Sequence, residues 1–132
     1  MLASAHVGAA EALTDLMEIS SQVRSAVMLA PDGAVEASTL EDEARTAELA
    51  GAAKQLLDAA DEVREGGGPV NQLEVATAEG SVFVVRDPDR LIAATTSADP
   101  TVGLVFYDLK SCLRDAAEKP APKRGKRKSN AS

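Results

Sequence analysis

The sequence has 132 residues, of which 45% are hydrophobic, 27% are charged and only 2% are aromatic, with no tryptophan. A chain of this length accommodates one domain with one sizeable core. The scarcity of aromatic side chains argues against a stacking platform for sugars or single-stranded nucleic acid. The single cysteine, Cys112, allows no internal disulfide, which indicates a reducing compartment.

Charge is distributed unevenly along the chain. Six of the 14 basic residues lie from Lys119 onward, and all 21 acidic residues precede it. Eight basic residues therefore stand against 21 acidic ones before Lys119, a net charge of −13, and the rest of the chain carries about +6. An acidic body repels nucleic acid, so any affinity for phosphate is expected in the C-terminal segment.

The start of the chain, MLASAHVGAAEAL, lacks a basic segment before an apolar stretch and so does not resemble a secretory signal. No apolar run approaches the roughly 18 residues of a membrane span. We therefore expect a cytoplasmic protein with three parts. These are a flexible N-terminus (1–9), one folded domain (10–118) and a disordered, Pro-spaced basic tail (119–132).

The first predicted elements are a helix and a hairpin. Apolar residues at helical spacing over 10–20 predict a short amphipathic helix. The stretch 23–30 loses that period and gains β-branched residues, which favours a strand, and 34–38 favours a second one. Between them, Pro31-Asp32-Gly33 has the turn chemistry of a hairpin, because proline pre-sets φ and glycine accepts φ > 0.

The longest predicted helix runs over 40–65, with Thr39 as its cap and three acidic residues in its first turn. A heptad-like stripe with small residues along it would let another helix approach closely; its members are Leu49, Ala53, Leu56, Ala60 and Val63. A second apolar line (Ala47, Ala50, Leu57) lies on an adjacent face. Three glycines and Pro69 end the helix; because they follow a helix and precede a strand, they do not fit a phosphate-binding loop.

Three more strands and a final helix complete the expected order. The stretch VNQLEVATA alternates polar and apolar residues, as an edge or interface strand does, whereas SVFVVR and LIAATTS are apolar enough for central strands. Asp99 and Pro100 are expected to cap the last helix. Its expected core face consists of Val102, Val105, Phe106, Leu109, Leu113 and Ala116, with Cys112 beside it as an apolar filler. Short links between strands make the expected sheet antiparallel.

The sequence contains no catalytic constellation. The only histidine, His6, stands near the N-terminus, so neither a Ser-His-Asp nor a Cys-His arrangement has a plausible base. One histidine and one cysteine are too few for a zinc site, and Asp32-Gly33 lacks the further acids of a calcium loop. We therefore predict a protein that is not an enzyme and that uses no cofactor, metal or small-molecule substrate.

Four stretches in this order make the chain resemble the Roadblock / dynein light chain family. They are VRSAVMLAPDGAVEAST, ARTAELAGAAKQLLDAADEV, SVFVVRDPDRLIAATT and DPTVGLVFYDLKSCLRDAAE, and the resemblance spans about residues 10–118. It implies an α+β fold with profilin-like α/β/α layers. A five-stranded antiparallel sheet would lie between one long helix and two terminal helices.

The resemblance also implies a homodimer, in which the long helices pair and the edge strands join two sheets. Its expected interface combines the helix stripe with the edge strand; the residues are Leu49, Ala53, Leu56, Ala60, Val63, Val70, Leu73 and Val75. Prokaryotic members of the family regulate Ras-like small GTPases, in part by repositioning the switch residues of the GTPase. On that analogy Arg45 and Arg64 are candidate GTPase contacts, although exposed arginines without such a role are common.

The resemblance thus favours a non-enzymatic homodimeric regulator or scaffold that binds a Ras-like small GTPase. Two alternatives remain open: an adaptor tethered to nucleic acid or anionic membrane by its tail, and a purely structural assembly subunit. The tail residues that would make such a contact are Lys123, Arg124, Lys126, Arg127 and Lys128. The tail could also have no role, dock on an acidic partner, or fold back on its own acidic domain.

Overall fold

The computed structural model describes residues 7–64, 66 and 69–118. In chain order its elements are α2 (Val7–Ile19), β1 (Val23–Leu29), β2 (Val35–Ser38), α3 (Glu43–Val63), β3 (Gln72–Ala76), β4 (Gly80–Arg86), β5 (Leu91–Ser97) and α4 (Val102–Glu118). The predicted order of helices and strands is confirmed. The tail residues 119–132 and residues 1–6 lie outside the described residues.

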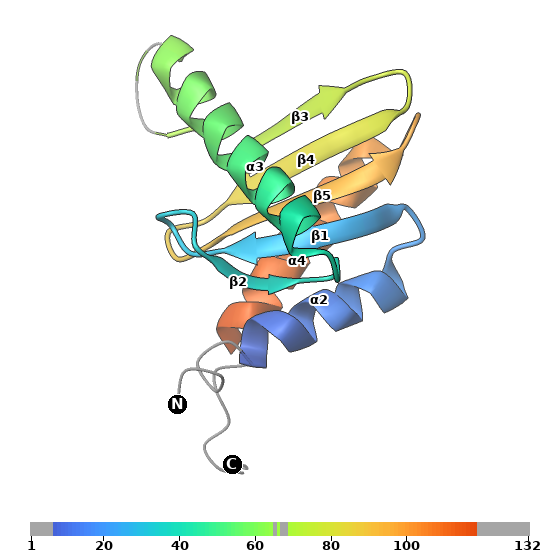
Figure 1. The fold of residues 1–132 in the computed structure, drawn as a ribbon. Helices are drawn as coiled ribbons and strands as arrows, with labels where there is room; N and C mark the ends of the chain where they lie inside the picture. The colour runs from blue at the N-terminus through green and yellow to red at the C-terminus, as the bar shows by residue number, and fades with distance from the viewer. Residues whose placement is uncertain (1–6, 65, 67–68, 119–132) are drawn as a thin grey trace.

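The five strands form one antiparallel sheet in the order β2-β1-β5-β4-β3. The apolar strands β4 and β5 lie inside the sheet, and the alternating strand β3 lies at an edge, as predicted. In Figure 1, α3 crosses one face of the sheet alone, whereas α4 lies behind the opposite face with α2 beside it. The predicted α+β architecture of three layers is therefore confirmed.

The hairpin between β1 and β2 has the predicted turn. Gly33 adopts φ 98°, a conformation that glycine accepts and side chains disfavour, and its N–H donates to the carbonyl of Ala30 at 2.9 Å. The Asp32 carboxylate accepts from the Ala34 N–H at 3.0 Å. Both groups serve the turn itself, so this loop orders the first two strands and holds no ligand set.

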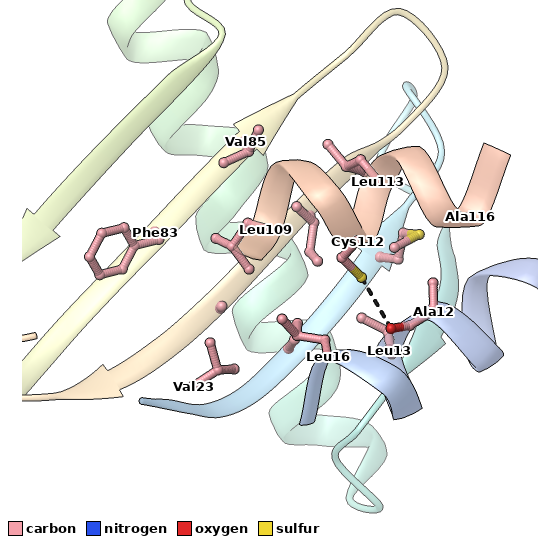
Figure 2. Packing of buried hydrophobic residues seen from close by; sticks show 14 of the residues in the cluster. Ala12, Leu13, Leu16, Val23, Phe83, Val85, Leu109, Cys112, Leu113 and Ala116 are labelled. Carbon is pink, nitrogen blue, oxygen red and sulfur yellow. Dashed lines mark hydrogen bonds between the residues drawn. The ribbon is translucent and has the colours of Figure 1, made fainter. Parts of the chain in front are cut away.

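The larger core fills the space between the sheet and the two terminal helices. Phe83 on β4 packs edge-on against Phe106 on α4, with ring centroids 5.0 Å apart and an interplanar angle of 77°. Figure 2 shows the same layer at the α2–α4 contact, where the Cys112 thiol donates to the Ala12 carbonyl at 3.3 Å. Cys112 is buried, as expected for an apolar filler.

Several predicted boundaries and one core residue are wrong. Asp42 caps α3 in place of Thr39, because the Asp42 carboxylate reaches the N–H groups of Ala44 and Arg45 at 2.8 and 3.3 Å. The Thr39 hydroxyl instead accepts from the Ala26 N–H on β1 at 2.9 Å. Thr39 and Asp42 are both residue types that can cap a helix. Because the Thr39 hydroxyl is hydrogen-bonded to β1, Asp42 is the residue that caps α3.

The two terminal helices also begin at other residues than predicted. α2 starts at Val7, ahead of the expected boundary at residue 10. At the start of α4 the Thr101 carbonyl accepts the first helical bond from the Val105 N–H at 3.0 Å, while Asp99 lies in a turn with φ 60°. Val102, in the first turn of α4, is exposed rather than part of the core, because the helix begins at the margin of the sheet.

Candidate interaction surface

The long helix α3 has one buried face and one open flank. Its buried residues face the sheet; they are Leu49, Ala50, Ala53 and Leu57. A second line of apolar residues lies beside this buried face, further around the helix. Its members are spaced by four, three and four positions; they are Ala52, Leu56, Ala59 and Val63. Leu56 is half-buried, the two alanines are exposed and the Val63 side chain is 79% exposed. We call this line the α3 stripe.

A groove of about 710 Å³ lies where α3 leaves the sheet uncovered. Arg45, Glu48 and Leu49 on α3 form one wall of the groove, and β-strand residues such as Val82 and Thr95 also line it. The Thr95 hydroxyl is 2.6 Å from that of Ser25, so these two polar groups satisfy each other. The groove continues the open flank of α3 onto the face of the sheet.

The free edge of β3 borders the same region. The Arg86 N–H donates to the Asn71 carbonyl and the Thr77 N–H to the Gly80 carbonyl, both at 2.8 Å. Since such pairs alternate along an antiparallel ladder, Leu73 and Val75 also direct their backbone groups to β4. Residues 72, 74 and 76 therefore present their N–H and carbonyl groups at the open edge, where another strand can pair with them.

A salt bridge fixes the start of β3 against α3. The guanidinium of Arg86 donates to the Asp61 carboxylate at 2.9 and 3.2 Å and to the Val70 carbonyl, while Asp61 accepts from the Val70 N–H at 2.8 Å. The hydrogen bond from Arg86 holds the pKa of Asp61 below its ordinary value, with the Val70 N–H adding to the effect. This cluster ties the C-terminal end of α3 to the edge strand.

The opposite end of the edge hairpin depends on Gly80. A Cβ atom added at Gly80 would lie 2.2 Å from the Thr96 carbonyl oxygen on β5, closer than real Cβ atoms approach backbone. The Thr77 hydroxyl donates to the Gly80 carbonyl at 2.8 Å and closes the turn. The absence of a side chain here lets β4 pair closely with β5 beside the groove.

The predicted helix stripe divides between two surfaces. Leu49 and Ala53 are buried against the protein's own sheet, so they are unavailable to a partner. Leu56 and Ala60 are half-buried, and Val63 is exposed. Ala52 and Ala59 complete the open line and were missed. Of the second predicted line, Ala50 and Leu57 face the sheet and Ala47 is exposed, because apolar spacing alone does not say how the helix is rotated against the sheet.

The strand residues of the predicted interface lie in or just before the edge strand β3. Val70 and Leu73 are half-buried beneath the C-terminal half of α3, and Val75 is 37% exposed near the free edge. These residues lie on the same side of the sheet as the α3 stripe.

The two candidate GTPase-contacting arginines lie far apart within one chain. Arg45 is in the first turn of α3 and Arg64 caps its last turn. They are 19 positions apart along the chain, which corresponds to about 28 Å at the rise of an α-helix. Both are exposed, but they do not form one basic patch in a single copy. The basic tail, including Lys123, Arg124, Lys126, Arg127 and Lys128, lies outside the described residues.

Within the described residues, no three histidine, cysteine or acidic side chains gather in a way that could hold a metal ion. Among the same residues, no helix combines the length and the apolar character that a membrane crossing needs.

Comparisons with known proteins identify the fold of this chain. No protein-family model and no curated protein matches the sequence. Solved structures nevertheless match over most of the chain, and the fold is that of Roadblock/LC7 domains, as the sequence patterns suggested.

Three of the similar structures illustrate the range of the fold. A Roadblock/LC7 domain from Streptomyces avermitilis is 20% identical, with a TM-score of 0.73, and the match covers 82% of this chain and 93% of that one. A structure of MglB with a tetrameric arrangement is 16% identical, with a TM-score of 0.70 and coverage of 83% and 88%. Profilin II from Acanthamoeba castellanii is 13% identical, with a TM-score of 0.54 and coverage of 80% and 93%.

Proposed function

We propose that this protein is a non-enzymatic homodimeric regulator or scaffold for a Ras-like small GTPase. The observation that carries the proposal is that the exposed α3 stripe, the groove of about 710 Å³ beside the N-terminal half of α3 and the free edge of β3 occur together around the sheet face that α3 covers. Apolar groups and unpaired backbone groups together suit a protein partner better than a small molecule. The Roadblock and MglB-like fold supports a regulatory or adaptor role.

A two-fold dimer uses all parts of this region. When two copies of α3 pack antiparallel, Ala52 of each lies near Val63 of the other, and Leu56 near Ala59. The alanines allow close approach of the two helices. The same symmetry places the two β3 edges side by side, so that their outward backbone groups can pair. The MglB structure with a tetrameric arrangement shows that a protein with this fold assembles into oligomers.

Dimerisation would also unite the two arginines. In the antiparallel arrangement, Arg45 of one copy and Arg64 of the other come to the same end of the helix pair, within about two helical turns. A GTPase seated on the paired helices would then meet both side chains. Its rate of GTP hydrolysis would change because binding shifts the population of its own switch conformations, with no catalytic group inserted by this protein.

The dimer is tested first, by light scattering coupled to gel filtration. Val63→Glu adds a charge to an exposed residue of the stripe, so the fold should persist while the dimer dissociates. Leu56→Glu should act in the same direction. Ala47→Glu is the matched control, since Ala47 is exposed on the same helix but away from the stripe. A wild-type monomer, or equal dimer stability in Val63→Glu and Ala47→Glu, would contradict this interface.

The strand edge is tested with proline. Glu74→Pro removes an N–H that points away from β4, so the ladder within the chain keeps its bonds, while pairing between the chains loses this N–H in both copies. Glu74→Thr keeps the N–H and serves as the control. We expect weaker self-association for the proline variant alone, and no difference between the two variants would show that the strand edge does not join two copies.

The regulatory role is tested with purified Ras-like small GTPases from the cell that makes this protein. We expect the wild-type protein to co-elute with one of them and to change its single-turnover rate of GTP hydrolysis. Val63→Glu should lose both effects and Ala47→Glu should keep them. If the wild-type protein is dimeric and neither binds any of these GTPases nor alters their rates, the regulator proposal fails while the dimer stands.

The separation of charge supports a second candidate function, an adaptor tethered by its basic tail to nucleic acid or anionic membrane. Removal of residues 119–132 should then abolish binding to DNA or to anionic vesicles at low salt. Binding that survives the deletion would exclude the tail as the tether. A protein that passes neither this test nor the GTPase test is better described as a structural assembly subunit.

A further inference from the structure

A second, smaller groove lies on the outer surface of the terminal helices, on the far side of the sheet from the α3 stripe. Its volume is about 220 Å³, and α2 and α4 form its walls. Large apolar side chains are exposed along it: Ile19 is 71% exposed and Tyr107 is 64% exposed. Leu104, three residues before Tyr107 on α4, is 47% exposed. Helices α2 and α4 therefore keep an exposed apolar surface that their packing against each other does not cover.

The charged residues that line this groove are all acidic. They are Asp15 from α2 and Asp108 and Asp115 from α4. Val7–Ile19 contains no basic residue at all. The two basic residues of α4, Lys110 and Arg114, line a different hollow, of about 680 Å³, beside the β4–β5 turn, and Arg114 reaches only the rim of this groove, where its guanidinium donates to the Ser111 hydroxyl at 3.2 Å. A partner for this groove must therefore bring positive charge as well as cover for apolar side chains.

The chain itself continues into a segment of that chemistry. The 14 residues after Glu118 include six basic residues and no acidic one. They leave the domain at the C-terminal end of α4, where the helix dipole also favours cations, one turn beyond Asp115. Asp108 lies ten residues before Glu118, about 15 Å back along the helix. Fourteen residues span up to about 46 Å, so the segment is long enough to return along the groove.

We propose that the basic segment 119–132 binds in cis to the groove between α2 and α4. Its ammonium and guanidinium groups pair with the Asp115 and Asp108 carboxylates, and an arginine stacks on the exposed Tyr107 ring. The aliphatic stems of its lysines and arginines cover Ile19 and Leu104. While the segment is bound in the groove, its positive charges are not available to other anionic surfaces. An anionic ligand must displace the segment from the groove before it can bind these charges.

A spin label on the full-length chain tests the position of the segment. Ser129→Cys carries the label, with Cys112→Ala added so that no second thiol reacts, and the unlabelled double variant provides the reference spectrum. The amide signals of Ile19, Tyr107 and Asp108 should broaden, and those of Ala47 and Gly51 on α3 should not. Raising NaCl from about 0.1 M to about 1 M shortens the Debye length from about 10 Å to about 3 Å and should reverse the broadening.

Charge-matched variants then separate this groove from general attraction to an acidic domain. In the labelled chain, Asp108→Asn with Asp115→Asn should remove the broadening, whereas Glu48→Gln with Glu62→Gln, which removes the same number of negative charges from exposed α3 residues, should not. Equal effects of the two pairs, or broadening spread over both faces of the sheet, would overturn the proposal. Broadening of unlabelled isotope-enriched chains mixed with spin-labelled chains would assign the contact to a second copy and overturn binding in cis.

Discussion

The two faces of the sheet are built to different degrees of closure. Two helices, α2 and α4, cover one face, and its core contains both phenylalanines of the chain. One helix, α3, covers the other face, where the core is smaller and a groove of about 710 Å³ remains open beside the helix. The closed face, under α2 and α4, contains the larger core, and the open face, under α3, contains the smaller one. The closed face is not sealed, because a hollow of about 680 Å³ lies beside α4.

The residues around the groove on the open face form specific polar contacts. The groove has satisfied polar groups in Ser25 and Thr95, and the Arg86–Asp61 bridge anchors the edge strand beside it. Gly80 permits close strand pairing at the other end of the same hairpin. The two faces therefore differ in the number of helices that cover them and in the size of the core beneath those helices.

The largest expected change in stability comes from removing a large side chain from the core under α2 and α4. Phe83→Ala removes a fully buried ring that contacts Phe106, and this should lower the free energy of unfolding by about 3–5 kcal/mol in urea denaturation. Val75→Ala on the open face should cost less than about 0.5 kcal/mol at concentrations where the protein is monomeric. Similar losses for both variants would show that the two faces contribute alike.

A smaller effect is expected at the rim of the open face. Gly80→Ala places a methyl group against the Thr96 carbonyl and should cost about 1–3 kcal/mol. Gly51→Ala is the matched control, because its Cβ would meet nothing within 4 Å in the middle of α3. Since alanine is the better helix former, this control should gain about 0.5–1 kcal/mol in thermal or urea unfolding. A neutral Gly80→Ala variant would mean that β4 and β5 can separate at little cost.

The smallest expected effect is a dependence on pH that belongs to the open face. The folded-state pKa of Asp61 lies below its ordinary value of 3.8, so its contribution to stability is present above pH 3.8 and declines as the pH falls through the folded-state pKa. Asp61→Asn should therefore be less stable than the wild type at neutral pH, with the difference shrinking in acid. Urea midpoints measured from neutral pH downward test this, and a constant difference would show that the charge of Asp61 does not matter.

Asp108 on the opposite face should respond in the other direction. Burial raises the pKa of its carboxyl, so ionisation of Asp108 opposes folding and stability is lost as the pH rises through that pKa. In the chain that lacks residues 119–132, Asp108→Asn should gain on its parent in the same urea series as the pH increases. In the full-length chain this gain should be smaller or reversed, because the basic segment proposed to bind beside Asp108 stabilises the ionised carboxylate.

The sequence alone determined the order of elements, the Pro31-Asp32-Gly33 hairpin and the edge position of β3. These features depend on local rules, namely turn chemistry, the period of apolar residues and the alternation of a strand with one covered face. It also indicated that Cys112 is buried. Such properties follow from neighbours within a few positions along the chain, so no tertiary contact was needed to infer them.

Only the tertiary structure decided which line of α3 meets the sheet. Two apolar lines, one through Leu49 and Ala53 and one through Ala52 and Ala59, differ by a single residue step, and the sheet buries the first with Leu57. It likewise decided that Asp42 rather than Thr39 caps the helix, since the Thr39 hydroxyl is used by β1. Rotation of a helix about its axis depends on what packs against it, and those partners are distant in sequence.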